Sequence, residues 1–372
     1  MSGLKLLSVS VTGFRNLAPV RVEPGEEVTF LHGPNGAGKT NFLDAVHFAL
    51  QGRSLRGGYA RDSIGFDSDA MRLEAIIDVQ GDEHRVACAV TRSGERLREL
   101  DGQTLAGSDR RLRLAVFHPD LLALVKGPPS QRRSFIDELT ANLRPSEADL
   151  RPRYGRTLAQ RNALARRVAA GSAPISDLGA WDDRLASLAA ELVASRTSTV
   201  GELTAAFPAV ASSLGLEGAT IEYRPKTGSD LSESEITTRL ADLRAGGDLG
   251  RSYLQYGPHM DEIEIRASGR PVRRFASQGQ QRTAVLALLL SERALAVAAG
   301  RPAPLLLLDD VMSELDPDRR AALAGALEGG QAILTATEAS QLPLTALGAG
   351  VSLMGVDEGV IDQGHGEASE AA

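Results

Sequence analysis

The sequence of 372 residues predicts an α/β fold into which a helical subdomain is inserted. Three observations lead to this prediction. A glycine-rich loop at residues 33–40 lies between an apolar run and a helix-like segment. Four consecutive leucines at 305–308 suit a strand that is buried on both faces of a parallel sheet. Between these two elements, residues 129–250 are rich in Ala, Leu and Arg with helical spacing, so a helical block interrupts the α/β part.

Residues 1–128 are predicted to form the N-terminal part of the α/β head. Residues 28–31 form a short apolar strand, and the dense apolar pattern of residues 41–50 predicts a mostly buried helix. Residues 71–90 alternate between apolar and polar side chains around Gly81-Asp82. Alternation at period two around turn residues predicts a β-hairpin.

The rest of the chain divides into three further segments. Residues 129–250 form the predicted helical subdomain, and residues 251–354, which return to strand-like patterns, form the C-terminal part of the head. Residues 355–372 contain five acidic and no basic residues, so they are expected to form a frayed acidic tail.

Composition excludes several classes of function. The chain is 42% apolar and 24% charged, and none of its apolar runs approaches the roughly 20 residues of a membrane-spanning helix. The alternating apolar residues at the start indicate a strand and not a signal peptide, so a cytoplasmic location is expected. Cys88 is the single cysteine and the six histidines show no metal-ligand spacing, which argues against disulfides, zinc sites and redox chemistry.

Charge is unevenly distributed along the sequence. The formal net charge of −7 argues against binding to nucleic acid. Residues 92–167, however, contain fifteen Arg and one Lys against nine Asp or Glu, a local net charge of +7. Because only four of the 41 basic residues are Lys, this stretch is compatible both with a solvated helical face and with a DNA surface.

Residues 33–40 match the phosphate-binding loop pattern at every fixed position. Glycines let backbone amides turn toward a phosphate chain, and the helix that follows offers free amides and the positive end of its dipole. Lys39 adds a charge near the β- and γ-phosphates, and the Thr40 hydroxyl is expected to bind Mg²⁺. A glycine-rich turn without a ligand is the alternative, and the strand and helix on either side argue against it. The residues expected to contact the nucleotide are Gly33, Asn35, Gly36, Ala37, Gly38, Lys39, Thr40 and Asn41.

Two carboxylates, Asp309 and Asp310, follow the predicted strand of four leucines. Ligands of open α/β sheets bind at the carboxyl ends of the strands, so these side chains are expected at the nucleotide. One of them can hold Mg²⁺ while the other polarises an attacking water. A turn or helix cap is the ordinary alternative, and the phosphate loop in the same chain favours the metal site.

A third motif, Ser277-Gln278-Gly279-Gln280, precedes an apolar helix expected over 283–298. Its serine and glycine amides stand at a helix N-terminus, which predicts a second anion site. An ordinary N-cap is the alternative, and the motif alone does not decide between the two.

The order of these motifs resembles that of the ABC-type ATPase heads, in the branch that includes the SMC proteins. Within that branch the chain is similar to the RecF family of bacterial recombination mediators. The helical block is far too short for an SMC coiled coil, and Asp309-Asp310 stands where many ABC heads have Asp-Glu. The fold implied is an ABC-type (SMC-like) P-loop ATPase head with a helical subdomain inserted. The similarity is carried by residues 36–41, 131–137, 256–259, 277–283 and 308–316.

The resemblance implies a role for each residue of the phosphate site. Lys39 would contact the phosphates and assist catalysis, and Thr40 and Asp309 would hold Mg²⁺. Asp310 would be the general base. Because Asp is one methylene shorter than the Glu of many ABC heads, slow hydrolysis is expected.

The resemblance also implies contacts outside the phosphate loop. Ser277, Gly279 and Gln280 would act on the nucleotide that is held by a second protomer. Arg15 and Asn16 would border the base and ribose. ATP would thus join two heads, and its hydrolysis would release them.

Two positions depart from the pattern of many ABC ATPases. His118 stands where those enzymes have the Q-loop glutamine, and Thr337 stands near the position of their switch histidine. The way in which the γ-phosphate is sensed is therefore left open.

The biological role implied by the resemblance is recombinational repair and replication restart. An ATP-induced homodimer would bind double-stranded DNA near gaps without sequence specificity and help RecR and RecO to load RecA. Weak, DNA-stimulated hydrolysis of ATP, with Mg²⁺ as the second cofactor, would cause release, and no membrane would be involved. A nucleotide-binding subunit of a membrane transporter is the main alternative, and a DNA-binding scaffold with a purely structural nucleotide is a third.

Overall fold

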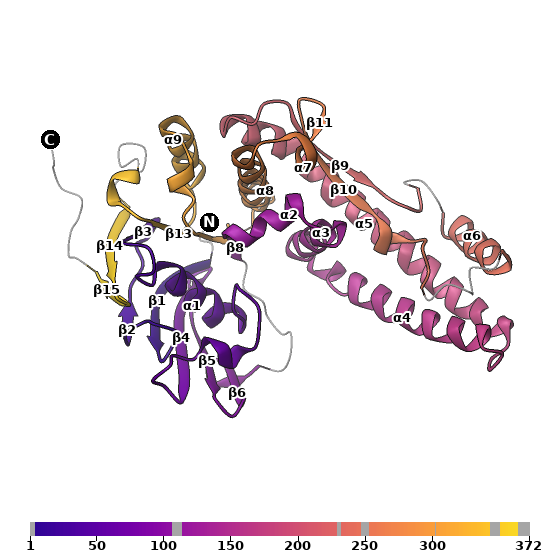
Figure 1. The fold of residues 1–372 in the computed structure, drawn as a ribbon, viewed down its shortest axis with the longest axis horizontal. Helices are drawn as coiled ribbons and strands as arrows, with labels where there is room; N and C mark the ends of the chain where they lie inside the picture. The colour runs from indigo at the N-terminus through magenta and orange to yellow at the C-terminus, as the bar shows by residue number, and fades with distance from the viewer. Residues whose placement is uncertain are drawn as a thin grey trace. The chain divides into compact units, whose positions relative to one another are not determined.

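The computed structural model describes residues 4–105, 114–228, 232–246, 253–301, 303–342 and 350–363. The chain forms two compact units, which Figure 1 shows as a ribbon. Unit 1 comprises Met1–Leu121, Ser213–Gly215 and Val285–Ala372, and unit 2 comprises Leu122–Ser212 and Leu216–Ala284. No helix in the described ranges combines the length and the apolar character needed to span a membrane.

Unit 1 contains an antiparallel sheet with the strand order β2-β1-β4-β5-β6-β7. The hairpin predicted over 71–90 is confirmed, because β4 and β5 pair along their whole length. Its turn residues, Gln80 and Gly81, have φ angles of 62° and 97°, as a two-residue hairpin turn requires. The strands of this sheet are β1 (Leu4–Thr12), β2 (Val20–Val22), β4 (Ala70–Val79), β5 (Asp82–Thr91), β6 (Arg96–Leu100) and β7 (Gln103–Thr104).

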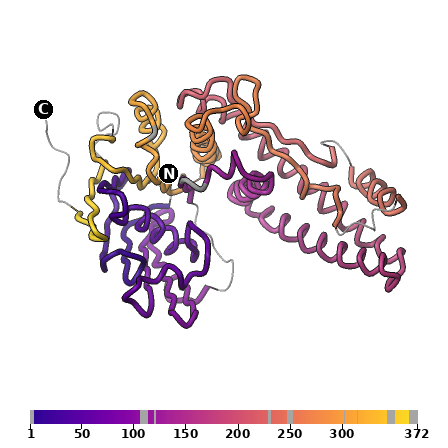
Figure 2. The backbone as a smooth tube through the Cα atoms, viewed as in Figure 1, coloured from indigo at the N-terminus to yellow at the C-terminus, as the bar shows by residue number. Residues whose placement is uncertain are grey.

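The second sheet of unit 1 has the order β15-β14-β3-β13-β12-β8, and all of its strands except β15 run parallel. Segments far apart in the sequence are neighbours in it. Figure 2 shows the yellow C-terminal strand β14 beside the indigo strand β3. The strands of this sheet are β3 (Val28–His32), β8 (Leu114–Phe117), β12 (Leu305–Leu308), β13 (Ala332–Ala336), β14 (Val351–Asp357) and β15 (Val360–Asp362).

Helix α1 (Lys39–Gln51) contacts strands of both sheets, and every residue from Phe42 to Leu50 is buried. The dense apolar pattern of this segment is therefore explained by burial on all sides, as predicted. Phe42 and Phe48 are at most 1% exposed, and burying side chains of this size stabilises the fold by about 1.5–3 kcal/mol each. Unit 1 also contains α9 (Pro317–Ala326) and most of α8 (Gln278–Ala298), which begins in unit 2.

Strand β12 confirms the prediction of a strand buried on both faces, since all four of its leucines are fully buried. Its neighbours β8 and β13 run parallel to it, and β3 runs parallel to β13. The carboxyl ends of these strands therefore meet at one edge of the sheet. Gly33, His118, Asp309 and Thr337 follow the four strands at this edge.

Unit 2 combines helices with a three-stranded antiparallel sheet of order β11-β10-β9. Its helices are α2 (Ala123–Lys126), α3 (Pro129–Leu143), α4 (Leu150–Ala169), α5 (Leu178–Ser213, of which Ser213 belongs to unit 1), α6 (Glu233–Ala245), α7 (Val272–Phe275) and the first residues of α8. Its strands are β9 (Ala219–Arg224), β10 (Glu262–Ala267) and β11 (Arg270–Pro271). Short 3-10 helices in the two units are η1 (Ala60–Ser63), η2 (Pro119–Leu122), η3 (Pro145–Glu147), η4 (Ile175–Asp177), η6 (Pro258–Met260), η7 (Met312–Glu314) and η8 (Ala339–Gln341).

The observed units differ from the predicted segments in two places. Strand β9, which lies inside the predicted helical subdomain of 129–250, pairs with β10, so residues 253–284 fold with unit 2 and not with the head. The expectation of a frayed acidic tail is wrong for residues 355–362. They complete β14 and form β15, because Val356 and Ile361 pack into the core of unit 1. The remainder of the predicted tail, residues 364–372, lies outside the described residues.

Candidate nucleotide-binding site

The phosphate loop joins the end of β3 to the start of α1, as the sequence predicted. It passes so close to β14 that a Cβ atom at Gly33 would lie 2.0 Å from the carbonyl oxygen of Val356. Real side chains cannot approach backbone this closely, so Gly33 is required by packing as well as by the phosphate-binding pattern. The close packing fixes the loop against the sheet.

Lys39 is only 8% exposed and its ammonium group folds back onto the loop. Its Nζ atom donates to the carbonyl oxygens of Gly33 and Pro34 at 2.7 and 2.8 Å. Burial lowers the pKa of Lys39, and the charges of Asp310 and Asp309 partly oppose this shift. The ammonium group is thus bonded to two neutral carbonyls. A bound phosphate, which is anionic, would be a stronger hydrogen-bond partner than either carbonyl.

Asp309 and Thr40 meet across the edge of the sheet although 269 positions separate them. The Thr40 hydroxyl lies 2.8 and 2.9 Å from Oδ1 and Oδ2 of Asp309. Thr335, from β13, donates a further hydrogen bond to Asp309 Oδ1 at 2.8 Å. A hydroxyl and a carboxylate are hard oxygen ligands of the kind that Mg²⁺ prefers, so the predicted metal ligands are brought together and fit this ion.

Asp310 adopts a left-handed backbone conformation with a φ angle of 51°. This conformation costs a non-glycine residue about 1–2 kcal/mol. The N–H group of Asp310 donates to Thr335 Oγ1 at 3.0 Å, which holds the backbone in place. Its Oδ1 atom is buried and has no hydrogen-bond partner in the described part of the chain, so it is available to a ligand or water.

Asn16 and Asn41, both predicted to border the nucleotide, are bonded to each other. Asn41 Nδ2 donates to Asn16 Oδ1 at 2.6 Å, and Asn16 Nδ2 donates to the carbonyl of Gly36 at 3.4 Å. The turn between β14 and β15 packs against the phosphate loop and the backbone of Asn16. Gly359 there donates to the carbonyl of Ala37 at 2.7 Å, and a Cβ atom at Gly359 would lie 1.9 Å from the carbonyl oxygen of Asn16.

Arg15 is held by a carboxylate that the sequence analysis did not single out. Asp44, on α1, is fully buried and accepts hydrogen bonds from Arg15 Nη2 at 2.6 Å, Ser54 Oγ at 2.9 Å and the Leu55 amide at 2.6 Å. A buried charge is tolerated only with such partners. The ion pair therefore fixes Arg15 relative to the helix that begins at the phosphate loop.

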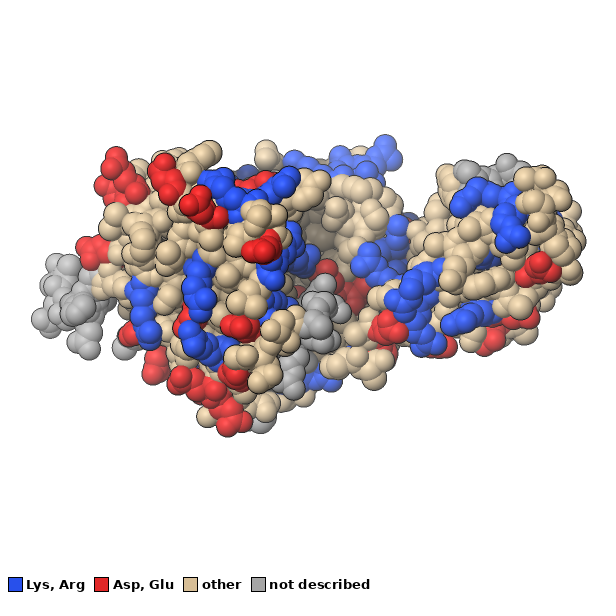
Figure 3. Space-filling view, turned by 90° about the horizontal axis from the view of Figure 1, so that it is seen from below, with Lys and Arg blue, Asp and Glu red and all other residues tan. Residues whose placement is uncertain are grey.

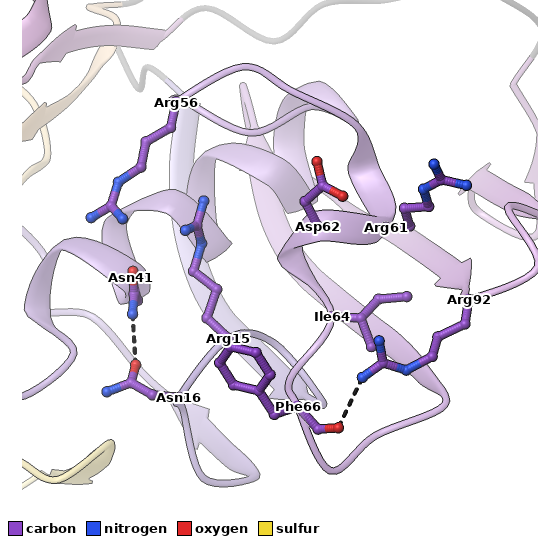
Figure 4. A pocket seen from close by; sticks show the side chains of 9 residues that line it. All are labelled: Arg15, Asn16, Asn41, Arg56, Arg61, Asp62, Ile64, Phe66 and Arg92. Atoms are coloured by element: carbon purple, nitrogen blue, oxygen red, sulfur yellow. Dashed lines mark hydrogen bonds between the residues drawn. The ribbon is translucent and has the colours of Figure 1, made fainter.

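A cavity of about 620 Å³ lies beside the phosphate loop, and Figure 4 shows the side chains that line it. Arg15, Asn16 and Asn41 of the predicted site are among them. Arg56 and Arg61, between α1 and β4, and Arg92, directly after β5, add positive charge, whereas Asp62 contributes one negative charge. Ile64 and the almost fully exposed Phe66 supply apolar surface. The cavity is suited to a ligand with an anionic part and a planar apolar part.

Arg92 directly follows β5 and lines one side of this cavity. Its guanidinium donates to the carbonyls of Gly65, Phe66 and Ser68 at 2.8–2.9 Å. The arginine and glycine residues between 53 and 61 were a signal for this region that the sequence analysis did not use. Asp44 and Thr335 gave no comparable signal, because their partners lie far away in the sequence or in a separate loop.

Ser277, Gly279 and Gln280 belong to unit 2 and are all exposed. The backbone N–H of Gln280 donates to Ser277 Oγ at 3.2 Å, and Gln280 Oε1 accepts from the Ser277 N–H at 2.9 Å. This reciprocal pair is a capping box at the start of α8. The ordinary N-cap role is thus observed, and the predicted contact with a second protomer's nucleotide stays a prediction.

His118 and Thr337 lie at the same edge of the sheet as the phosphate loop. His118 directly follows β8, whose last residue, Phe117, accepts a hydrogen bond from the Asp309 amide at 2.8 Å. Thr337 follows β13 and accepts a hydrogen bond from Gln341 Nε2 at 3.3 Å. Both residues directly follow strands of the parallel sheet, and their roles stay a prediction.

The two sheets around α1, the phosphate loop after β3 and the carboxylates after β12 define an ABC-type, SMC-like P-loop ATPase head. A family model described as "RecF/RecN/SMC N terminal domain" matches residues 5–352. The head domain of an SMC protein bound to the C-winged helix domain of ScpA has the same fold, with a TM-score of 0.59 at 16% identity over 96% of each chain.

Comparison with more similar proteins identifies the family within this class to which the chain belongs. "DNA replication and repair protein RecF" of Anaeromyxobacter sp. (strain K) is 37% identical over 90% of this chain and 93% of its own length. The structure of "the recombination mediator protein RecF-ATP in RecFOR pathway" superposes with a TM-score of 0.83 at 27% identity, covering 97% of this chain and 98% of the other. The chain belongs to the RecF family of this class.

Proposed function

We propose that this protein is an ATP-dependent DNA-binding protein of recombinational repair and replication restart. The observation that carries the proposal is the meeting of Lys39, Thr40, Asp309 and Asp310 at one edge of the parallel sheet. The similarity to proteins named for DNA replication and repair, over nine-tenths of the chain, supports the same role.

ATP would bind with its phosphates in the loop of residues 33–40. The loop amides and the start of α1 would hold the phosphate oxygens, and Lys39 would exchange its two carbonyl partners for the β- and γ-phosphates. The base and ribose would occupy the cavity lined by Arg15, Asn16 and Asn41. A similar chain described with ATP supports this assignment.

Thr40 and Asp309 would hold Mg²⁺, and the ion would neutralise charge on the phosphates during transfer to water. Asp310 would take the proton of the attacking water at its Oδ1 atom, which is buried and has no described partner. The short side chain of Asp310 is consistent with slow hydrolysis.

A second protomer would complete the site through the motif of residues 277–280. Ser277, Gly279 and Gln280 are exposed, and the neighbouring Phe275 is 60% exposed. An exposed aromatic side chain beside exposed polar groups is typical of a protein interface. These features support an ATP-induced homodimer.

Helix α4 is the best candidate in unit 2 for contact with duplex DNA. Its sequence contains six arginines and no acidic residue. Arg161 is buried against Asp182 and serves the fold, whereas the other five are exposed. Figure 3 shows Lys and Arg side chains in several groups over the part of unit 2 that carries α4 to α6, with Asp and Glu among them. Such a surface suits phosphate contacts without a sequence code.

The basic stretch of 92–167 is not one surface in the structure. Arg92 and Arg132 bind backbone carbonyls within their own units, and Arg132 also pairs with Glu262. Three further arginines of the stretch lie outside the described residues, at positions 110, 111 and 113. Only part of the +7 net charge of this stretch is therefore available to bind DNA. Among the described residues, we assign DNA binding to the exposed side of α4.

By membership of its family, the protein would act with RecR and RecO in the loading of RecA. A similar structure is described as part of the RecFOR pathway, which supports this assignment.

Light scattering with ATP, Mg²⁺ and duplex DNA tests the proposed function directly. We expect the molar mass to double when ATP and Mg²⁺ are added, and DNA to bind the dimer with an affinity that falls as salt concentration rises. Single-turnover phosphate release should be faster with DNA. Hydrolysis that is indifferent to DNA would favour the transporter subunit, and ATP that binds without hydrolysis would favour the structural nucleotide.

A mixture of two variants tests whether residues 277–280 act on the partner's nucleotide. Ser277→Arg should bind ATP as a monomer, because the bulky cation blocks the second protomer and leaves the phosphate loop intact. Lys39→Met lacks a working loop but keeps Ser277. The mixture can form one complete site, so we expect partial recovery of ATPase activity, whereas neither variant alone should be active.

The matched control is Ser232→Arg, since Ser232 caps α6 with Glu235 in the same way that Ser277 caps α8 with Gln280. Loss of either cap should cost about 1 kcal/mol of stability. If Ser277→Arg alone dimerises and hydrolyses ATP like Ser232→Arg, the shared site is wrong.

A further inference from the structure

Thr335 is a fully buried residue near the carboxyl end of β13 whose hydroxyl group contacts both aspartates. Thr335 Oγ1 lies 2.8 Å from Asp309 Oδ1 and 3.0 Å from the backbone nitrogen of Asp310. The contact exists because β13 lies beside β12 in the parallel sheet, with Leu334 opposite Leu308.

The direction of both hydrogen bonds follows from their chemistry. A backbone N–H can only donate, so the Thr335 oxygen accepts the bond from Asp310. The hydroxyl hydrogen is then free to be donated to the carboxylate of Asp309. One hydroxyl group therefore uses its donor on one aspartate and an acceptor site on the other.

We propose that Thr335 is a positioning residue that sets the metal-binding carboxylate and the general base at the same time. This inference rests on the function proposed above. Its bond to the Asp310 amide holds that residue at a φ angle of 51°, and no described hydrogen bond holds the Oδ1 atom of its carboxylate. The backbone therefore determines the direction in which this carboxylate points.

The bond to Asp309 has a separate consequence for Mg²⁺. Thr40 bonds both oxygens of Asp309, whereas Thr335 bonds Oδ1 alone. If Thr40 were to bind Mg²⁺, Thr335 would still hold the carboxylate by Oδ1, and Oδ2 would be available to the ion. Thr335 thus maintains the orientation of Asp309 while its other partner changes.

Thr335→Val in the full-length chain tests the inference, because Val keeps the branched shape and removes the hydroxyl. We expect the Mg²⁺ concentration for half-maximal binding of a fluorescent ATP analogue to rise about 10- to 100-fold, the range found when partners of metal ligands are lost. Binding measured without Mg²⁺ should change less than twofold. Thr335→Ser, which keeps the hydroxyl, should restore the Mg²⁺ dependence of the parent.

Thr29→Val is the matched control. Thr29 is fully buried on β3, and its hydroxyl accepts a hydrogen bond from the Gly25 amide at 2.8 Å, at the opposite end of the strand from the phosphate loop. This variant should leave the Mg²⁺ dependence unchanged. If Thr335→Val does not fold, Thr335→Ala and Thr335→Ser, which differ by the hydroxyl alone, provide the same comparison.

The outcomes separate this inference from the proposed function. Suppose that the parent binds the analogue in a Mg²⁺-dependent way. If Thr335→Val and Thr335→Ser then show the same Mg²⁺ dependence, the proposed role of Thr335 is wrong and the proposed function is unaffected. A parent protein that shows no Mg²⁺-dependent binding of the analogue overturns both.

Discussion

Lys39→Met should weaken ATP binding about 10- to 100-fold and prevent ATP-dependent dimerisation at modest ATP concentrations. A hydrogen bond to a charged group contributes about 1.5–3 kcal/mol, and each 1.4 kcal/mol corresponds to about a tenfold change in affinity. Equilibrium binding of ATP, followed by light scattering, measures both effects. Dimerisation at the parental ATP concentration would contradict the role of Lys39.

Lys39 also has a part in the fold. Its side chain is only 8% exposed and bonds two loop carbonyls. Met leaves these carbonyls without their donor, so a small loss of stability is expected as well. Lys126→Met, at an exposed position of α2, is the control for the substitution itself and should leave ATP binding unchanged.

Asp310→Asn should reduce ATP hydrolysis about 10²- to 10⁴-fold, the usual contribution of a general base. ATP binding and dimerisation should persist, because Asp309, Thr40 and Lys39 are unchanged. The fold should also persist, since Asn tolerates the left-handed conformation of this position well and keeps the amide that donates to Thr335. Single-turnover phosphate release and ATP binding, measured on the same preparation, separate the two effects.

Asp309→Asn is the matched variant for this experiment. Asp309 bonds Thr40 and Thr335, so its loss should weaken Mg²⁺-dependent ATP binding itself. If Asp310→Asn fails to bind ATP while Asp309→Asn binds it normally, the roles of the two aspartates are reversed.

The local patterns of the sequence predicted the elements that are built from neighbouring residues. The phosphate loop, the buried helix after it, the hairpin over 71–90 and the strand of four leucines each depend on a short pattern, and each is present. The predicted order of motifs also placed Asp309 and Asp310 at the edge where the phosphate loop lies. Parallel strands bring their carboxyl ends together, so this part of the site followed from the strands alone.

The parts that could not be predicted depend on pairing between distant segments. Strand β9 was missed because six residues between long helices give little signal until β10 is seen to pair with them. The last acidic residues resembled a solvated tail, although Val356 and Ile361 pack into the core. Thr335 and Asp44 have partners that only the folded chain brings near, and a single Thr or Asp carries no pattern of its own.

The position of β3 in its sheet determines when a growing chain can acquire its nucleotide site. Strand β3 emerges early in synthesis, but its neighbours β13 and β14 begin at Ala332 and Val351, and the turn that supports the loop lies at Gly359. At roughly 5–20 residues per second, translation of the intervening 300 residues takes on the order of 15–60 seconds. During that interval the phosphate loop has neither sheet neighbour. We therefore expect that a ribosome-bound chain cannot hold ATP until β13, β14 and the turn at Gly359 have been synthesised.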